Sequence, residues 1–156
     1  MELNIRKAET RDIPRISELL SQVLEVHAAG RPDLFKSGTT KYDETELAEI
    51  IGNPDRPIFV AEHGGVVVGY AFCVFQRHEE RNSPCYTTLY IDDLCVDEKS
   101  RGLNVGRTLY EYVLKFAKDS GCYNVTLNVW ACNESAMKFY ETCGLQVQKI
   151  GMEKIL

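Results

Sequence analysis

The chain has 156 residues, of which 44% are hydrophobic and 26% charged, and its formal net charge is −5. This balance excludes a disordered or fibrous chain and is typical of one soluble globular domain with a sizeable core. The negative charge disfavours nucleic acid as a partner, because phosphate groups bind preferentially to positively charged surfaces. It is compatible with a cationic small molecule or a basic peptide as partner.

The sequence shows no sign of export, membrane insertion or metal binding. Its longest apolar stretch, VVVGYAFCVF at 66–75, is shorter than the roughly 20 residues that span a bilayer, and its opening MELNIRKAET holds no apolar core of signal-peptide length. The six cysteines include no CxxC pair and no histidine at zinc-finger spacing, which favours reduced thiols over disulfides or a metal site. We therefore expect a cytoplasmic protein with no membrane partner and no metal.

Hydrophobic periodicity divides the chain into strands and helices. In chain order the patterns predict a strand at 5–9, helices at 13–24 and 44–51, strands at 57–62, 66–77 and 86–98, a helix at 106–120, a strand at 123–130, a helix at 134–143, and final strand material at 145–150 and 152–156. Asp12 can cap the first helix, and Asp43 with Glu46 forms a capping box before the second. Residues 27–42 between these helices are predicted to be irregular. This order predicts one mixed α/β domain over residues 1–156, a single sheet with helices on its faces.

The turn RGLNVGRT at 101–108 connects a predicted strand to a predicted helix and has the composition of an anion site. The first N–H groups of a helix have no partner within the helix, and the positive end of the helix dipole lies behind them. Glycines let the backbone approach a ligand, and the guanidinium groups of Arg101 and Arg107 can pair with phosphate oxygens. A tight connection with solvated arginines is the alternative. A nucleotide phosphate loop is disfavoured, because neither GxxxxGKS/T nor GxGxxG is present.

Three segments and the element order resemble the GNAT superfamily of N-acetyltransferases over essentially the whole chain. The segments are YIDDLCV at 90–96, RGLNVG at 101–106 and NESAMKFYETCGL at 133–145. The resemblance implies a central, mostly antiparallel twisted sheet with helices on both faces, splayed between the strands that hold the cofactor. It also implies an acetyl-CoA-dependent enzyme without a metal, which moves the acetyl group to a primary amine by direct attack in a ternary complex.

By this resemblance the turn and the strand before it bind coenzyme A. The backbone amides of the turn would hold the pyrophosphate, and the strand would bond the pantetheine arm through its backbone. The implied cofactor residues are Leu94, Cys95, Val96, Arg101, Gly102, Leu103, Asn104, Val105, Gly106, Arg107, Thr108 and Asn133. Asn104 stands where the family has glycine, and asparagine tolerates the left-handed region at a cost of about 1 kcal/mol. Asn133 can also be explained as a helix cap alone.

The resemblance implies Tyr140 as the acid that protonates the leaving sulfur, although periodicity alone favours a packed aromatic beside Phe139. Asp92 is the favoured base, acting directly or through water, and Glu98 is a reserve candidate. Neighbouring residues on a strand point to opposite faces, so only one of Asp92 and Asp93 is expected to face the acceptor. Alternatively, one aspartate meets a loop cation and the other supports a bulge.

The acceptor itself is left open as a polyamine, an aminoglycoside-like amine, an amino acid or a peptide. In the family arrangement residues 27–36 line the acceptor side, where His27, Asp33 and Phe35 can contact substrate. Alternatively, RPD at 31–33 is only a turn and Phe35 only a packing anchor. A non-catalytic acyl-CoA sensor of the same fold is the second hypothesis, against which Tyr140 and the acidic pair count. A metal or redox protein rests on the cysteines alone. Dimers are frequent in the family, so the resemblance also allows a homodimer paired through 86–98 or the final strands.

Overall fold

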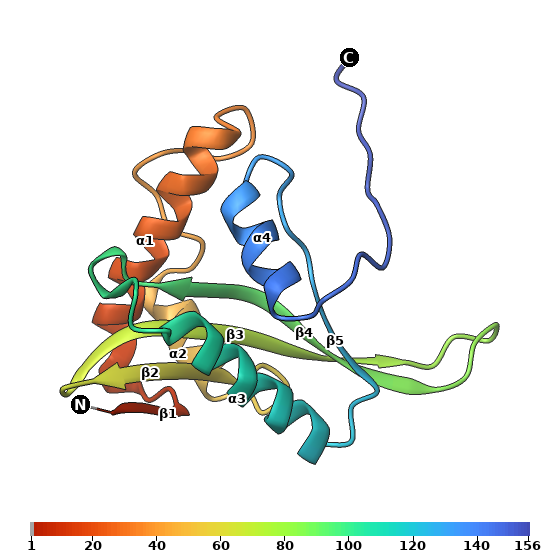
Figure 1. The fold of residues 1–156 in the computed structure, drawn as a ribbon, viewed down its shortest axis with the longest axis horizontal. Coiled ribbons are helices and arrows are strands. Elements are labelled where there is room, and N and C mark those ends of the chain that lie inside the picture. Colours follow the sequence, from red (N-terminus) through yellow and green to blue (C-terminus); the bar gives the residue numbers. More distant parts are fainter. Residues whose placement is uncertain (1) are drawn as a thin grey trace.

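The computed structural model describes residues 2–156 and contains one five-stranded sheet in the order β1-β2-β3-β4-β5 (Figure 1). The strands are β1 (Leu3–Lys7), β2 (Ile58–His63), β3 (Val66–His78), β4 (Tyr86–Val96) and β5 (Asn124–Leu127). Neighbours are antiparallel except β4 and β5, which run parallel. The predicted mixed sheet is therefore confirmed.

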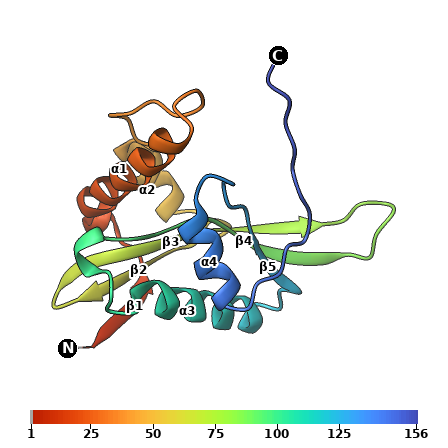
Figure 2. The ribbon, with the colours of Figure 1, turned by 45° about the horizontal axis from the view of Figure 1, so that its top comes forward.

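The described chain contains four α-helices. They are α1 (Ile13–Gly30), α2 (Glu44–Ile51), α3 (Val105–Asp119) and α4 (Glu134–Thr142), with 3-10 turns η1 (Thr10–Asp12) and η2 (Glu98–Ser100) before α1 and α3. Helices α1 and α2 lie on one side of the sheet and α3 lies on the other (Figure 2). Among residues 2–156, no helix combines the length and apolarity needed to cross a membrane.

Each face of the sheet has its own hydrophobic core. The core under α1 and α2 includes Ile16, Leu19, Leu47, Tyr70, Phe72 and Cys95. The core under α3 includes Phe59, Leu89, Ile91, Leu109 and Val113. Because both faces are covered, β2 and β3 are apolar almost throughout rather than alternating. Gly69 of β3 lies close to both the neighbouring strand and α3: a Cβ there would lie 2.8 Å from the carbonyl oxygen of Cys95 on β4 and 3.1 Å from Val105 Cγ1 on α3.

The two predicted helix starts behave differently. Asp43 and Glu46 form the reciprocal capping box of α2, as predicted. Asp12 precedes α1, but its carboxylate does not bond the helix; it accepts hydrogen bonds from Arg6 at 2.8 and 3.0 Å and from the Glu9 N–H at 2.8 Å. The Arg6 guanidinium holds the pKa of Asp12 below its usual value, against the effect of burial. Helix α1 also runs to Gly30, so the irregular segment begins at Arg31.

The prediction of strands at 145–150 and 152–156 was wrong. Neither stretch forms a strand, and after α4 the chain runs away from the sheet in an extended conformation (Figure 1). Leu145 still packs against the core under α3, but Val147, Ile150 and Met152 are exposed. The periodicity is that of strands, yet within residues 2–156 no strand pairs with the segment.

Candidate active site

The sheet opens at the carboxyl end of β4. The last parallel pair joins Ile91 to Leu127, so residues 92–96 of β4 have no neighbour on the β5 side. The predicted splay between these strands is therefore present. It leaves a stretch of strand backbone unpaired along one edge, which is the geometry needed to bind an extended ligand.

Only part of that backbone is free to bond a ligand. The Asp97 N–H donates to the Val68 carbonyl at 2.8 Å. In an antiparallel pair, residues alternate between those that hydrogen-bond to the neighbouring strand and those that point away from it, so this bond shows which residues of β4 bond to β3. By that alternation the backbone groups of Cys95 point to β3, while those of Leu94 and Val96 point to the open side. The Cys95 side chain is buried in the core under α1 and α2.

A β-bulge brings both aspartates to the same side of the sheet. Cys73 pairs with Ile91 and Phe72 pairs with Asp93, so Asp92 is the extra residue of β4. Asp92 Oδ2 accepts hydrogen bonds from Lys41 Nζ at 2.9 Å and Tyr42 Oη at 3.1 Å.

Asp93 Oδ2 accepts a hydrogen bond from Tyr70 Oη at 2.7 Å. Tyr70 belongs to the core under α1 and α2, and Tyr42 stacks on Phe72 of the same core at a centroid distance of 5.7 Å. The prediction that the two carboxylates face opposite sides was therefore wrong. The alternative in which one aspartate meets a loop cation holds for Asp92.

Asp93 and Tyr140 are neighbouring titratable groups, and each is partly buried. Burial raises the pKa of Asp93 to about 6, although the hydrogen bond from Tyr70 acts in the opposite direction. Burial also raises the pKa of Tyr140 above its usual value, and the charge of Asp93 raises it further. Tyr140 is therefore a neutral phenol at physiological pH, with its proton available for donation.

Asp93→Asn is expected to stabilise the fold increasingly as pH rises. Because folded Asp93 keeps its proton up to about pH 6 and the unfolded chain loses it near 3.8, the folded state binds more protons between these values and loses stability with rising pH. The asparagine variant has no titrating carboxylate at this position, so this loss of stability does not occur, and its side-chain oxygen can still accept the hydrogen bond from Tyr70. The difference in unfolding free energy should grow by about 3 kcal/mol between about pH 4 and pH 7. Urea unfolding across that range measures it, and a difference independent of pH would contradict the burial of Asp93.

The turn before α3 has the predicted conformation. Asn104 lies in the left-handed region with φ 60° and ψ 25°, the only non-glycine residue with positive φ in 2–156, and Gly102 has φ 91°. In the same part of the chain, no protein acceptor meets the N–H groups of residues 104–107; the first bond runs from the Thr108 N–H to the Asn104 carbonyl at 3.1 Å. Free amides thus point out of the helix start.

The side chains of the turn are mostly turned to solvent. Arg101 and Leu103 are exposed, whereas Val105 is buried and presents only its amide. Arg107 pairs with Glu111 at 3.1 Å, an exposed contact that a stronger anion can replace. The Thr108 hydroxyl donates to the Asn104 carbonyl at 2.8 Å.

An ion pair that the sequence did not predict anchors this turn to α1. The buried carboxylate of Asp97 accepts hydrogen bonds from Arg15, from Gln22 at 3.3 Å and from the Lys99 N–H at 3.3 Å. Arg15 also donates to the Val67 carbonyl at 2.9 Å. Burial alone would raise the pKa of Asp97, but these bonds together hold it below its usual value. No local pattern connects α1 to a residue so distant in sequence.

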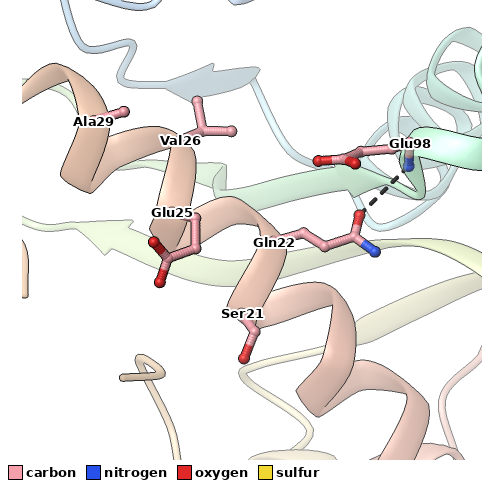
Figure 3. Close-up of a pocket in the computed structure, with 6 residues that line it drawn as sticks. All are labelled: Ser21, Gln22, Glu25, Val26, Ala29 and Glu98. Atoms are coloured by element: carbon pink, nitrogen blue, oxygen red, sulfur yellow. Dashed lines mark hydrogen bonds between the residues drawn. The ribbon is translucent and has the colours of Figure 1, made fainter. Parts of the chain in front are cut away.

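A shallow pocket borders the same anchor (Figure 3). Its lining consists of Ser21, Gln22, Glu25, Val26, Ala29 and Glu98. The Glu98 N–H donates to Gln22 Oε1 at 3.4 Å. Glu98 therefore lies beside α1.

Helix α4 carries Tyr140 to the opening. Asn133 Oδ1 accepts from the Ala136 N–H at 3.2 Å, so its role as a cap is observed. Phe139 packs on the start of α3, because a Cβ on Gly106 would lie 3.2 Å from its Cζ atom. The ring of Tyr140 lies 5.1 Å from that of Phe139, and within residues 2–156 its hydroxyl has no hydrogen-bond partner.

Aromatic side chains line the side of the opening that faces α1. Phe35 lies between His27 and Trp130, with centroid distances of 5.0 and 5.3 Å. Burial lowers the pKa of His27, and the charge of Lys41 lowers it further. Asp33 pairs with Arg31 instead of facing this cluster.

Two further contacts complete this side. The side-chain amide of Asn128 donates a hydrogen bond to Tyr90 Oη at 3.2 Å. Burial raises the pKa of Tyr90, and the charge of Asp92 raises it further. A Cβ on Gly30 would lie 2.6 Å from Cys132 Sγ, so the end of α1 touches the segment between β5 and α4. The described residues include no group of three or more His, Cys, Asp or Glu side chains placed to hold a metal, and all six cysteines are free.

Comparison with known proteins identifies the family of this fold and site. Bovine (Bos taurus) thialysine N-epsilon-acetyltransferase is 29% identical over 87% of this chain and 74% of its own length. The structure of glucosamine-6-phosphate N-acetyltransferase from Arabidopsis thaliana is 28% identical, with a TM-score of 0.72 and 99% of both chains covered. A tetramutant of the BH1408 protein from Bacillus halodurans is 28% identical, with a TM-score of 0.93 over 98% of this chain and 99% of that one. Residues 20–145 match the family described as Acetyltransferase (GNAT) family, and the chain belongs to that family.

Proposed function

We propose that this GNAT acetyltransferase transfers an acetyl group from acetyl-CoA to the primary amine of a small cationic acceptor. One observation carries the proposal. The unpaired stretch 92–96 of β4 carries the carboxylates of Asp92 and Asp93 at one end, on the α1 side of the sheet, and leads through the following turn to the free amides at the start of α3. A phosphate-bearing thioester and a cationic amine can thus meet along one strand.

The residues of the opening fit coenzyme A, the acyl donor that GNAT acetyltransferases use. The amides of residues 104–107, with Arg101 and Arg107 beside them, would hold the pyrophosphate. The backbone groups of Leu94 and Val96 would bond the pantetheine arm as a neighbouring strand does.

The reaction would proceed by direct attack of the amine on the thioester carbonyl. A C–N bond forms, the C–S bond breaks, and the departing sulfur takes a proton from Tyr140. A backbone N–H of β4 would stabilise the oxyanion. A free amine with a pKa of about 10.4 is almost wholly protonated at neutral pH, so a proton must leave it first. We assign that step to Asp92, directly or through water, because its carboxylate already contacts an ammonium group.

The charges around the acceptor side support a cationic substrate. Asp92 and Asp93 supply the only two acidic side chains of the bulge, and Tyr42 and Tyr90 place aromatic rings near Asp92. Aromatic faces and carboxylates together favour ammonium groups. The bovine relative is named for an ε-amino group of thialysine, which is also a primary amine.

Lys41→Gln is expected to lower the KM for a cationic acceptor about tenfold, equivalent to roughly 1.4 kcal/mol. The Lys41 ammonium occupies Asp92 at 2.9 Å, and an acceptor ammonium has to displace it. Steady-state kinetics with a diamine measure the change. Lys36→Gln is the control, because Lys36 lies on the same loop and, within residues 2–156, makes no ion pair. An increased KM would show instead that Lys41 helps to build the acceptor site.

The experiment that tests the proposed function is a thioester-consumption assay across an amine library. The library should contain diamines and polyamines, lysine analogues, aminoglycosides, basic peptides and amino-sugar phosphates. We expect turnover with cationic amines and little with anionic amino sugars. Preference for an anionic acceptor would overturn the acceptor assignment. Tight coenzyme A binding with no turnover of any amine would favour the acyl-CoA sensor.

A further inference from the structure

The side chain of Lys41 lies where the amine of an acceptor would bind. Its Nζ atom is 2.9 Å from Asp92 Oδ2, the carboxylate to which we assign removal of the acceptor's proton. Within residues 2–156 only one other lysine forms an ion pair, Lys115, which pairs with Asp119 one turn along α3. A primary amine at the end of an alkyl chain is also the chemical class of the proposed acceptor. Lys41 therefore presents a substrate-like group to the candidate base.

The loop that carries Lys41 is held in place on both sides of it. Before Lys41, the Glu25 carboxylate on α1 accepts hydrogen bonds from the Ser37 hydroxyl and the Gly38 N–H, both at 2.7 Å. After Lys41, the ring of Tyr42 stacks on Phe72 of the core under α1 and α2. The contact between Lys41 and Asp92 is thus set by the surrounding structure.

The fold does not require this contact. The Lys41 side chain is 47% exposed, and an ion pair with so exposed a partner contributes about 1 kcal/mol or less to stability. Tyr42 Oη also donates to Asp92 at 3.1 Å, so the carboxylate keeps a hydrogen-bond partner when the ammonium leaves. Lys41 can therefore leave Asp92 at little cost to the structure.

Lys41 can reach the place where the proposed function puts the thioester. Leu94, whose backbone faces the open side of β4, is two residues from Asp92, which is roughly 7 Å along a strand. A lysine has a flexible four-carbon stem, so its nitrogen can move by a few ångströms while the backbone of the loop stays fixed.

We propose that Lys41 is itself an acetyl acceptor, and that its acetylation within the same chain releases Asp92 for the free substrate. This inference rests on the proposed function, because it uses the same thioester, base and acid. It adds a modification site and a form of regulation: the unmodified enzyme blocks its own base with an ammonium group, and one turnover on itself removes the block.

The chemistry of the step is that of the proposed transfer. Burial alone would lower the pKa of Lys41, but the hydrogen bond and the charge of Asp92 together raise it above its usual value. The ammonium therefore has to pass a proton to Asp92, and from there to water, before it can attack.

The amine then forms a C–N bond with the acetyl carbon while the C–S bond breaks and the sulfur takes a proton from Tyr140. The second proton that the nitrogen loses restores Tyr140 through solvent. The products are Nε-acetyl-lysine at position 41, free coenzyme A and one proton in solution.

Mass spectrometry of the full chain after incubation with deuterated acetyl-CoA, without any amine, tests the modification. Deuterium separates newly transferred acetyl groups from any that the chain already carries. We expect one new acetyl group per chain, at Lys41, formed at a first-order rate that does not change with protein concentration. Tyr140→Phe should slow this labelling about 100-fold. Lys36 and Lys115 report direct chemical acetylation and should label slowly in both proteins.

Steady-state kinetics test the regulation. Enzyme treated beforehand with acetyl-CoA should show a KM for a diamine about tenfold lower than untreated enzyme. Lys41→Arg is the matched control, because arginine keeps a cation beside Asp92 but offers no amine to acetylate. Its KM should not respond to the treatment. An unchanged KM in fully labelled wild-type enzyme would contradict the release of Asp92.

The remaining outcomes separate this inference from the proposed function. Turnover of free amines without label on Lys41 would overturn the inference and leave the proposed function in place. Equal labelling of Lys41, Lys36 and Lys115, or labelling that Tyr140→Phe does not slow, would show direct reaction with the thioester and also overturn it. A rate that rises with protein concentration would show transfer between copies rather than within one chain. The absence of both label and amine turnover would contradict the proposed function as well.

Discussion

Gly106→Val is expected to weaken coenzyme A binding at least 30-fold, about 2 kcal/mol. Gly106 lies among the free amides at the start of α3, and even a Cβ there would lie 3.2 Å from Phe139 Cζ and 3.5 Å from Val96 Cγ2. A branched side chain would crowd the approach of a phosphate and push Phe139 away. Since Phe139 neighbours Tyr140, turnover should fall as well. Isothermal titration calorimetry with coenzyme A measures the affinity.

Two companion variants sharpen this result. Gly106→Ala adds only the Cβ and should give an intermediate loss. Gly52→Val is the matched control, because a Cβ there meets only ordinary contacts at 3.7 Å at the end of α2. Unaltered affinity in Gly106→Val, with the fold intact, would show that the phosphates bind elsewhere.

Tyr140→Phe is expected to lower kcat about 100-fold while the affinity for coenzyme A changes little. The variant keeps the ring beside Phe139 and removes only the hydroxyl, which has no partner within residues 2–156 and so carries no structural bond. Because burial and Asp93 raise the pKa of Tyr140, the wild-type proton stays in place until the sulfur leaves. Pre-steady-state measurement of thiol release reports this step directly.

A tyrosine far from the opening provides the control for this experiment. Tyr123 is 79% exposed, and Tyr123→Phe should turn over like the wild type. If Tyr140→Phe kept full turnover while chemistry limited the rate, the sulfur would be protonated by another group. The assignment of Tyr140 as the acid would then be withdrawn.

The strongly periodic elements were predictable from the sequence, because their patterns are local. The capping box at Asp43 locates the start of α2, and the left-handed conformation of Asn104 follows from what asparagine tolerates where glycine is usual. The turn before α3 was predicted as an anion site, and its free amides are present. Family resemblance added the splay between β4 and β5, which local patterns do not encode.

What the sequence could not predict depends on contacts between distant residues. The bulge at Asp92 turns both aspartates to one side, and nothing in the run IDD indicates where the extra residue falls. The bond from Lys41 to Asp92 joins a loop to a strand, and the bond from Arg15 to Asp97 joins α1 to the residue that follows β4. The strands expected at 145–150 and 152–156 do not form, because a strand needs a neighbour to pair with and none of the described strands pairs with this segment.

A structure of the protein with coenzyme A bound tests the central claim most directly. The account predicts that pyrophosphate oxygens lie within hydrogen-bond distance of the amides of residues 104–107, with the pantetheine arm along Leu94 and Val96 and its sulfur facing Tyr140. A pyrophosphate bound away from the start of α3, or a sulfur remote from β4, would contradict it.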